Sequence, residues 1–99
     1  MPKVLKSKDF AEHLNTTFHI ETPIDLDLEL TDVTDRSNTQ IEQFSILFAG
    51  AASPWLRQGT YPLAHPAMGQ LELFLVPLGP RDGRMVYQSI FSRLIATSL

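Results

Sequence analysis

The sequence predicts an all-β protein: a single small antiparallel barrel or sandwich of about six strands with a short N-terminal helix packed against one end. Three observations predict this fold class. Apolar and polar residues alternate over several short stretches, and turn-forming residues separate these stretches. No stretch is long and periodic enough to supply the helices of a βαβ scheme. We therefore expect residues 1–99 to form a single β domain.

The first predicted element is a helix over residues 8–14. Ser7 is its expected N-cap, and Phe10 and Leu14 fall at helical spacing on one face. Because so short a helix is marginal in water, both side chains are expected to point inward and to plug one end of the barrel. Asn15 is expected to end the helix.

Three strands are predicted next. Residues 16–20 are β-branched and aromatic. In residues 24–30, isoleucine and leucine alternate with Asp25, Asp27 and Glu29, which is typical of a half-buried strand. Turn-forming residues fill 32–39, and the strand over 41–49 follows. Its apolar pattern slips near Glu42 and Gln43, which indicates a bulge there.

A β-hairpin over residues 59–77 is the strongest pattern in the chain, with arms over 59–64 and 71–76. Pro77 and the following Gly79-Pro80 are expected to end the second arm at Val76. A second turn at Asp82-Gly83 leads to the last strand, over 85–94. The residues expected to shape the hairpin are Gly59, Tyr61, His65, Pro66 and Gly69. We expect the His65 ring to hydrogen-bond a backbone group at the connection.

Composition excludes several classes of function. The net charge of −3 and the pI near 5.4 argue against binding to nucleic acid or to an anionic membrane surface. The absence of cysteine excludes disulfides and thiolate chemistry. The basic start of the chain has no apolar run behind it, and no apolar stretch is long enough to span a bilayer. A soluble cytoplasmic protein is therefore expected.

No set of residues predicts an enzyme, a cofactor or a metal. Asp25, Asp27 and Glu29 offer oxygen ligands for calcium, but a solvated strand face explains them better. The three histidines, His13, His19 and His65, lack the spacing of a metal site. Ser53 lies outside any nucleophile motif, and the glycines form no phosphate loop. For Glu42 and Glu72, a paired arginine, Arg57 or Arg93, is a simpler expectation than a general acid.

The loop over residues 50–59 carries the most unusual feature. Trp55 and Leu56 either fold back as a lid on a barrel end or form, with Arg57, an exposed site for another protein or a second copy of the chain. This predicts a non-enzymatic interaction or assembly module. The alternative is a barrel that binds a small apolar ligand in a cavity lined by Phe18, Phe44, Phe48, Phe74 and Tyr87.

Three stretches resemble an uncharacterised family of small bacterial proteins known as a domain of unknown function. They are F-S-I-L-F-A-G at 44–50, Q-G-T-Y-P-L-A-H-P-A-M-G at 58–69 and L-E-L-F-L-V-P at 71–77. The string H-P-x-x-G-x-x-E-L-F-L-V-P is the most specific of them, and it specifies a hairpin rather than a reaction. The resemblance implies an accessory role in a phage-tail-like or surface assembly and brings no catalytic residues.

Overall fold

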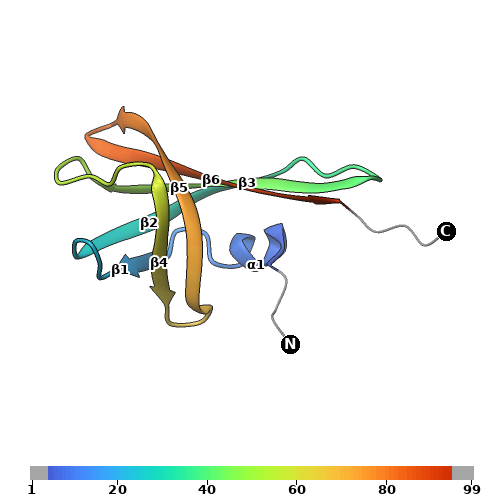
Figure 1. The fold of residues 1–99 in the computed structure, drawn as a ribbon, viewed down its shortest axis with the longest axis horizontal. Helices are drawn as coiled ribbons and strands as arrows, with labels where there is room; N and C mark the ends of the chain where they lie inside the picture. Colours follow the sequence, from blue (N-terminus) through green and yellow to red (C-terminus); the bar gives the residue numbers. More distant parts are fainter. Residues whose placement is uncertain (1–4, 95–99) are drawn as a thin grey trace.

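The computed structural model describes residues 5–94 of the 99-residue chain. Six antiparallel strands close into a barrel rather than a sandwich, in the order β1-β2-β3-β6-β5-β4, and one short helix packs against it (Figure 1). The all-β prediction and the six strands are confirmed. The elements are α1 (Ser7–Ala11), β1 (Thr17–Ile20), β2 (Leu26–Asp35), β3 (Ile41–Ala51), β4 (Gly59–His65), β5 (Gly69–Arg81) and β6 (Arg84–Leu94).

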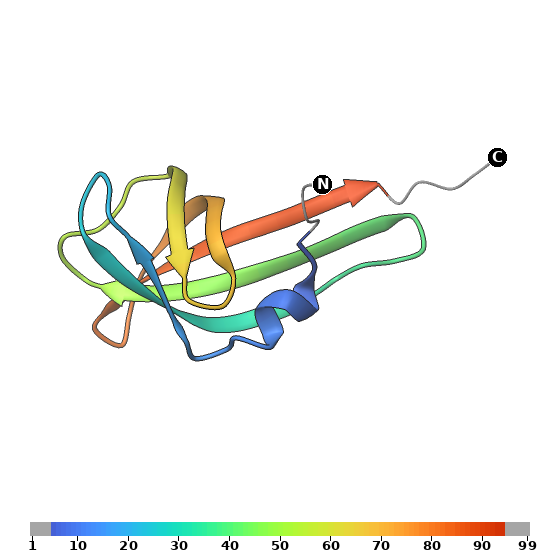
Figure 2. The same cartoon turned by 90° about the horizontal axis from the view of Figure 1, so that it is seen from below.

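The barrel is closed unevenly. β3 and β6 pair without interruption from Ile41↔Leu94 to Ala51↔Arg84, and the two strands run on together past the point where β5 turns away (Figure 2). At the other extreme, β1 and β4 share only the pair His19↔Ala64. The barrel therefore has one long, continuous wall and one narrow seam.

Among the described residues the sheet has two bulges, one in β2 and one in β5, and the sequence analysis predicted neither. Thr31 is the extra residue of β2, since Leu30 pairs with Phe48 and Asp32 with Leu47. The bulge expected near Glu42 and Gln43 is wrong, because β3 keeps an unbroken register with β6 there. Residues 41–43 are all half-buried, so neither face constrains their polarity and the apolar pattern slips without a change in pairing.

Strand β5 is longer than predicted. Pairing was expected to stop at Val76, but β5 continues to Arg81 through two prolines and a bulged residue, Leu78. The register explains how Pro77 and Pro80 are tolerated. β4 pairs with β5 only from Gly69 to Leu75, so the prolines lie where β5 has a neighbour on one side only.

The hairpin connections have the expected backbone. Gly69 has φ 78° where the second arm begins, and Asp82 and Gly83 both have positive φ, at 51° and 79°. Two successive positive φ values match the right-handed twist of the flanking strands in a two-residue turn. Both predicted turns are therefore confirmed.

The helix is shorter than predicted and starts one residue earlier. It ends at Ala11, and Asn15 with φ 65° redirects the chain into β1. Ser7 lies inside the helix rather than capping it, and its hydroxyl donates to the Asp35 carboxylate at 2.7 Å. Phe10 is fully buried as expected, but Leu14 lies past the end of the helix and is 39% exposed, so its predicted inward orientation is wrong.

Aromatic rings fill the interior. Phe10 reaches in from α1, with its ring centroid 6.5 Å from that of Phe18 and 5.9 Å from that of Phe44. Phe18 and Phe48 meet edge to face at 5.3 Å. Phe74, expected to line an interior cavity, instead points outward and is 48% exposed, because it alternates with Leu73 and Leu75, which point inward and are buried.

Candidate functional site

The loop between β3 and β4, residues 52–58, is called the Trp55 loop below. One of its residues matches the predicted lid, and two others match the predicted exposed site. Trp55 is half exposed at 50%, whereas the next residue, Leu56, is buried in the core. Leu56 therefore acts as the lid and is absent from the surface that was expected to include it. Trp55 and Arg57, the other two residues of the expected partner site, are exposed.

Two tyrosines fix the chain directly after Trp55. The backbone N–H of Leu56 donates to the Tyr87 hydroxyl at 2.8 Å, inside the barrel. The Tyr61 hydroxyl donates to the backbone carbonyl of Arg57 at 2.5 Å. Burial raises the pKa of Tyr87, which keeps its hydroxyl protonated. The indole of Trp55 is thus presented from a loop whose next two residues are tied to the barrel.

His65 fixes the connection between β4 and β5. Its Nδ1 accepts hydrogen bonds from the backbone N–H groups of Ala67 at 3.0 Å and Met68 at 3.2 Å. Since Nδ1 is an acceptor, we assign the proton of the neutral ring to Nε2, which lies 2.9 Å from the Thr16 hydroxyl oxygen. Burial lowers the pKa of His65, and the nearby imidazole of His13 lowers it further. Thus the expected backbone hydrogen bond is present, and the ring also ties the hairpin to the start of β1.

The other hairpin residues have structural positions. Gly59 begins β4 opposite Leu75, and a side chain there would contact the Tyr61 ring. Pro66 is exposed in the three-residue connection, and Gly69 starts β5 opposite His65. These residues shape the hairpin and bring no reactive groups together.

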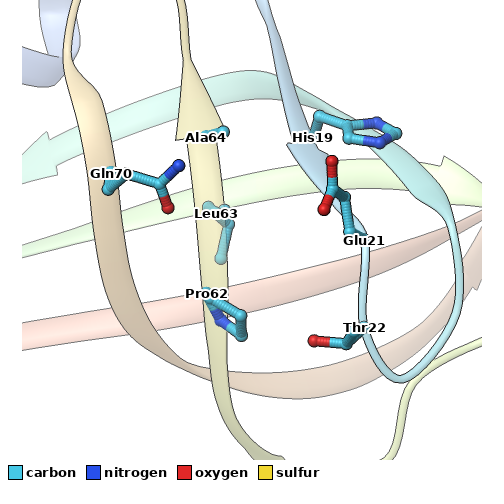
Figure 3. Close-up of a pocket in the computed structure, with 7 residues that line it drawn as sticks. All are labelled: His19, Glu21, Thr22, Pro62, Leu63, Ala64 and Gln70. Atoms are coloured by element: carbon cyan, nitrogen blue, oxygen red, sulfur yellow. The ribbon is translucent and has the colours of Figure 1, made fainter.

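A small pocket of about 130 Å³ lies over the narrow seam between β1 and β4 (Figure 3). The side chain of Gln70 on β5 points toward β4 from one side, and those of His19 and Glu21 lie across β4 on the other. The seam is open because β1 and β4 pair only at His19 and Ala64. Its lining residues are His19, Glu21, Thr22, Pro62, Leu63, Ala64 and Gln70.

Two carboxylates hold the His19 ring beside this pocket. Nε2 lies 2.7 Å from Asp25 and Nδ1 lies 2.6 Å from Asp27. The hydrogen bond with Asp27 raises the pKa of His19 above 6.5. Desolvation opposes the rise, and the charges of Asp25, Asp27 and Glu21 add to it. Both ring nitrogens are therefore engaged with carboxylates.

Two of the remaining acidic candidates, Glu29 and Glu42, are paired with arginine. Glu29 lies 2.8 Å from Arg84, so all three acidic side chains once considered for calcium face a basic group. Glu42 receives two hydrogen bonds of 3.1 Å from Arg93, which is one of the two arginines expected beside it. Glu72 is exposed on β5 opposite Pro62, and Ser53 is exposed in the Trp55 loop. Within residues 5–94, no group of three or more His, Cys, Asp or Glu side chains is placed to hold a metal ion.

No helix in the described part of the chain has the length and apolar character needed to cross a membrane.

Comparisons with known proteins identify a family and no named relative. Neither the curated proteins nor the solved structures contain a match to the chain. One family model, described as a domain of unknown function (DUF6916), matches residues 5–91. The matched segment runs from the residues before α1 into β6, and so includes the Trp55 loop and the β4–β5 hairpin. The chain therefore belongs to the DUF6916 family.

Proposed function

We propose that this protein is a non-enzymatic interaction module that binds another protein through the end of the barrel where Trp55 and Arg57 are exposed. One observation supports it above the others: a half-exposed tryptophan stands next to two residues anchored by buried or backbone hydrogen bonds. Tryptophan is enriched in binding hot spots, and a fixed loop loses little conformational entropy when it binds.

The alternative, an apolar ligand inside the barrel, has less support. Four of the five side chains expected to line a cavity, Phe18, Phe44, Phe48 and Tyr87, are buried in one core cluster, and Phe10 from the helix packs among them. The fifth, Phe74, points away from the interior. Barrels of six strands are generally filled by their own side chains in this way.

The resemblance of the hairpin supports a more specific role. We propose that the partner belongs to a phage-tail-like or surface assembly of a bacterial cell, and that the protein acts in the cytoplasm. The motif H-P-x-x-G-x-x-E-L-F-L-V-P at 65–77 supports the first part. The acidic, cysteine-free composition is compatible with the second.

Replacing Trp55 by alanine tests the proposed surface. The wild-type protein and W55A are each added to extract of the native host, and the amount of partner bound is measured by quantitative mass spectrometry. We expect W55A to lose at least about tenfold in bound partner, because a hot-spot residue contributes 2 kcal/mol or more, roughly thirtyfold in affinity.

A matched control separates binding from folding. Phe74→Ala removes an aromatic side chain of similar exposure from the outer face of β5 and should leave partner binding unchanged. A large fall in the melting temperature of W55A with no loss of bound partner would refute the proposal. Equal losses from W55A and F74A would also refute it, because they would show no preference for the Trp55 loop.

A further inference from the structure

One edge of β6 is open over residues 89–94. β5 pairs with β6 only as far as Val76↔Gln88 and then turns away toward β4, whereas β3 follows β6 to Leu94 (Figure 2). Among residues 5–94, no strand pairs with the other edge of this segment. Along this edge, the backbone N–H and C=O groups of alternate residues therefore point sideways, in the plane of the sheet, toward the place of a further strand.

Two other free strand edges are less suited to pairing with a further strand. Beyond Leu75, β5 carries two prolines and the bulge at Leu78, all of which oppose pairing with a further strand. On β2 the free edge is occupied at Leu30, whose N–H donates to the Thr16 carbonyl and whose carbonyl accepts from the N–H of Asn15, and beyond Leu30 the strand carries the charged residues Asp32 and Asp35. The β6 segment, S-I-F-S-R-L, has no proline, no glycine and no bulge.

The side chains of this segment also permit pairing. Ile90 points to the outer face and is 59% exposed, the most exposed large apolar side chain among the described residues. The cation in the segment, Arg93, is neutralised by Glu42 on β3. The inner face is protected, because Phe91 stacks on Phe44 with ring centroids 4.5 Å apart.

We propose that residues 89–94 pair with the same residues of a second copy, antiparallel across a two-fold axis, so that two barrels share one continuous β3-β6 sheet. Two copies of the segment do not repel each other strongly, because Glu42 neutralises Arg93 in each copy. Two-fold pairing is also the commonest way in which identical chains associate. This inference deepens the proposed interaction function by naming a partner for a second surface. The Trp55 loop lies at the opposite end of the β3–β6 ribbon, so the two surfaces are separate (Figure 1).

The alternation of side chains limits the register. Residues that lie directly opposite each other on antiparallel strands have side chains on the same face of the sheet. The two-fold axis must therefore pass midway between the two copies of one residue, so that this residue faces itself. An axis at Arg93 would place two arginines opposite each other, and one at Ile90 would leave only residues 89–91 to pair, because β5 covers the edge at Gln88. The axis therefore passes either between the two copies of Phe91 or between the two copies of Ser92.

Sedimentation velocity of the full chain at millimolar concentration tests the dimer. We expect the wild type to sediment as a dimer and Ile90→Lys to sediment as a monomer, with the dissociation constant raised at least about tenfold, since an outward lysine on an edge strand opposes pairing. Ile90 is exposed, so this variant should fold, which circular dichroism verifies. Phe74→Lys, a matched change at an exposed apolar residue of β5, should remain a dimer.

Single cysteines test the register in a chain that has no others. Oxidation of Ser92→Cys should form a linked dimer if the axis passes through Ser92. If it passes through Phe91, residue 90 faces residue 92 of the other copy, so a mixture of Ile90→Cys and Ser92→Cys chains should link instead. A monomeric wild type, a dimer lost in F74K but kept in I90K, or the absence of both cross-links would overturn the inference. Partner binding that depends on Trp55 would survive that result, so the two proposals fail separately.

Discussion

At the scale of single residues, His65 connects three segments through a neutral ring. Its Nδ1 satisfies two backbone N–H groups of the hairpin connection, and its Nε2 meets the Thr16 hydroxyl. His65→Ala should lower the free energy of unfolding by about 1–3 kcal/mol, because two partly buried N–H groups lose their acceptor. Urea denaturation measures the loss. His13→Ala, which removes the neighbouring ring and leaves these bonds in place, should cost less; an equal loss would contradict the role of His65.

The lowered pKa of His65 also sets the sign of a pH effect. The unfolded chain takes up a proton at this residue near pH 6.5, while the folded chain resists protonation. The stability difference between wild type and H65A should therefore be fully present above pH 6.5 and shrink as the pH falls through the lowered pKa. Denaturation curves at several pH values check this, and a difference that grows on acidification would contradict it.

His19 has the opposite dependence. Its pKa is raised by the hydrogen bond with Asp27, so its contribution is fully present below pH 6.5 and is lost as the pH rises through the raised pKa. NMR titration of the ring should give a midpoint above 6.5, and Asp27→Asn should lower it. Glu29→Gln, on the same strand but paired with Arg84, should change the midpoint less. Equal shifts in both variants would contradict the assignment.

Some of these residue contacts follow from sequence and others do not. The position of His65 before Pro66, at a hairpin connection, was enough to predict a ring-to-backbone hydrogen bond. The bond between Tyr87 and Leu56 joins residues 31 apart in sequence. A tyrosine in an apolar strand indicates that its hydroxyl needs a partner, but only the closed barrel identifies which backbone group supplies it.

At the scale of elements, the loop between β3 and β4 places two adjacent residues in opposite environments. Leu56→Ala should destabilise the fold by about 2–5 kcal/mol, because it empties a buried site. Trp55→Ala should change stability by no more than about 0.5 kcal/mol if its exposed ring contributes chiefly to binding. Urea denaturation of both variants distinguishes them, and comparable losses would contradict the division between anchor and surface.

The strands themselves show where periodicity stops being informative. Alternation predicted the buried residues of β2, because one face of that strand meets the core. It could not place the ends of β5, because Pro77 and Pro80 end a strand with neighbours on both sides but not one with a single neighbour. That distinction depends on where β4 stops, which is a property of the whole sheet.

At the scale of the whole molecule, the fold class was predictable and the surfaces were not. Six periodic stretches separated by turn residues were enough to predict an all-β domain, but not to choose between barrel and sandwich. The choice depends on the seam at His19 and Ala64, where one pair of residues closes the ring. The open edge of β6 likewise follows from the way β5 pairs with β4 up to Leu75 and with β6 only from Val76 onward.

The central claim is that the barrel interior is filled by its own side chains, so that binding takes place on the outer surface. The most direct test is a methyl NMR titration of the core residues Ile20, Leu28 and Ile46 with a panel of fatty acids and aromatic hydrocarbons. Our account predicts that their chemical shifts stay unchanged at every ligand concentration. Saturable shifts of all three methyl groups would place a ligand inside the barrel and contradict it.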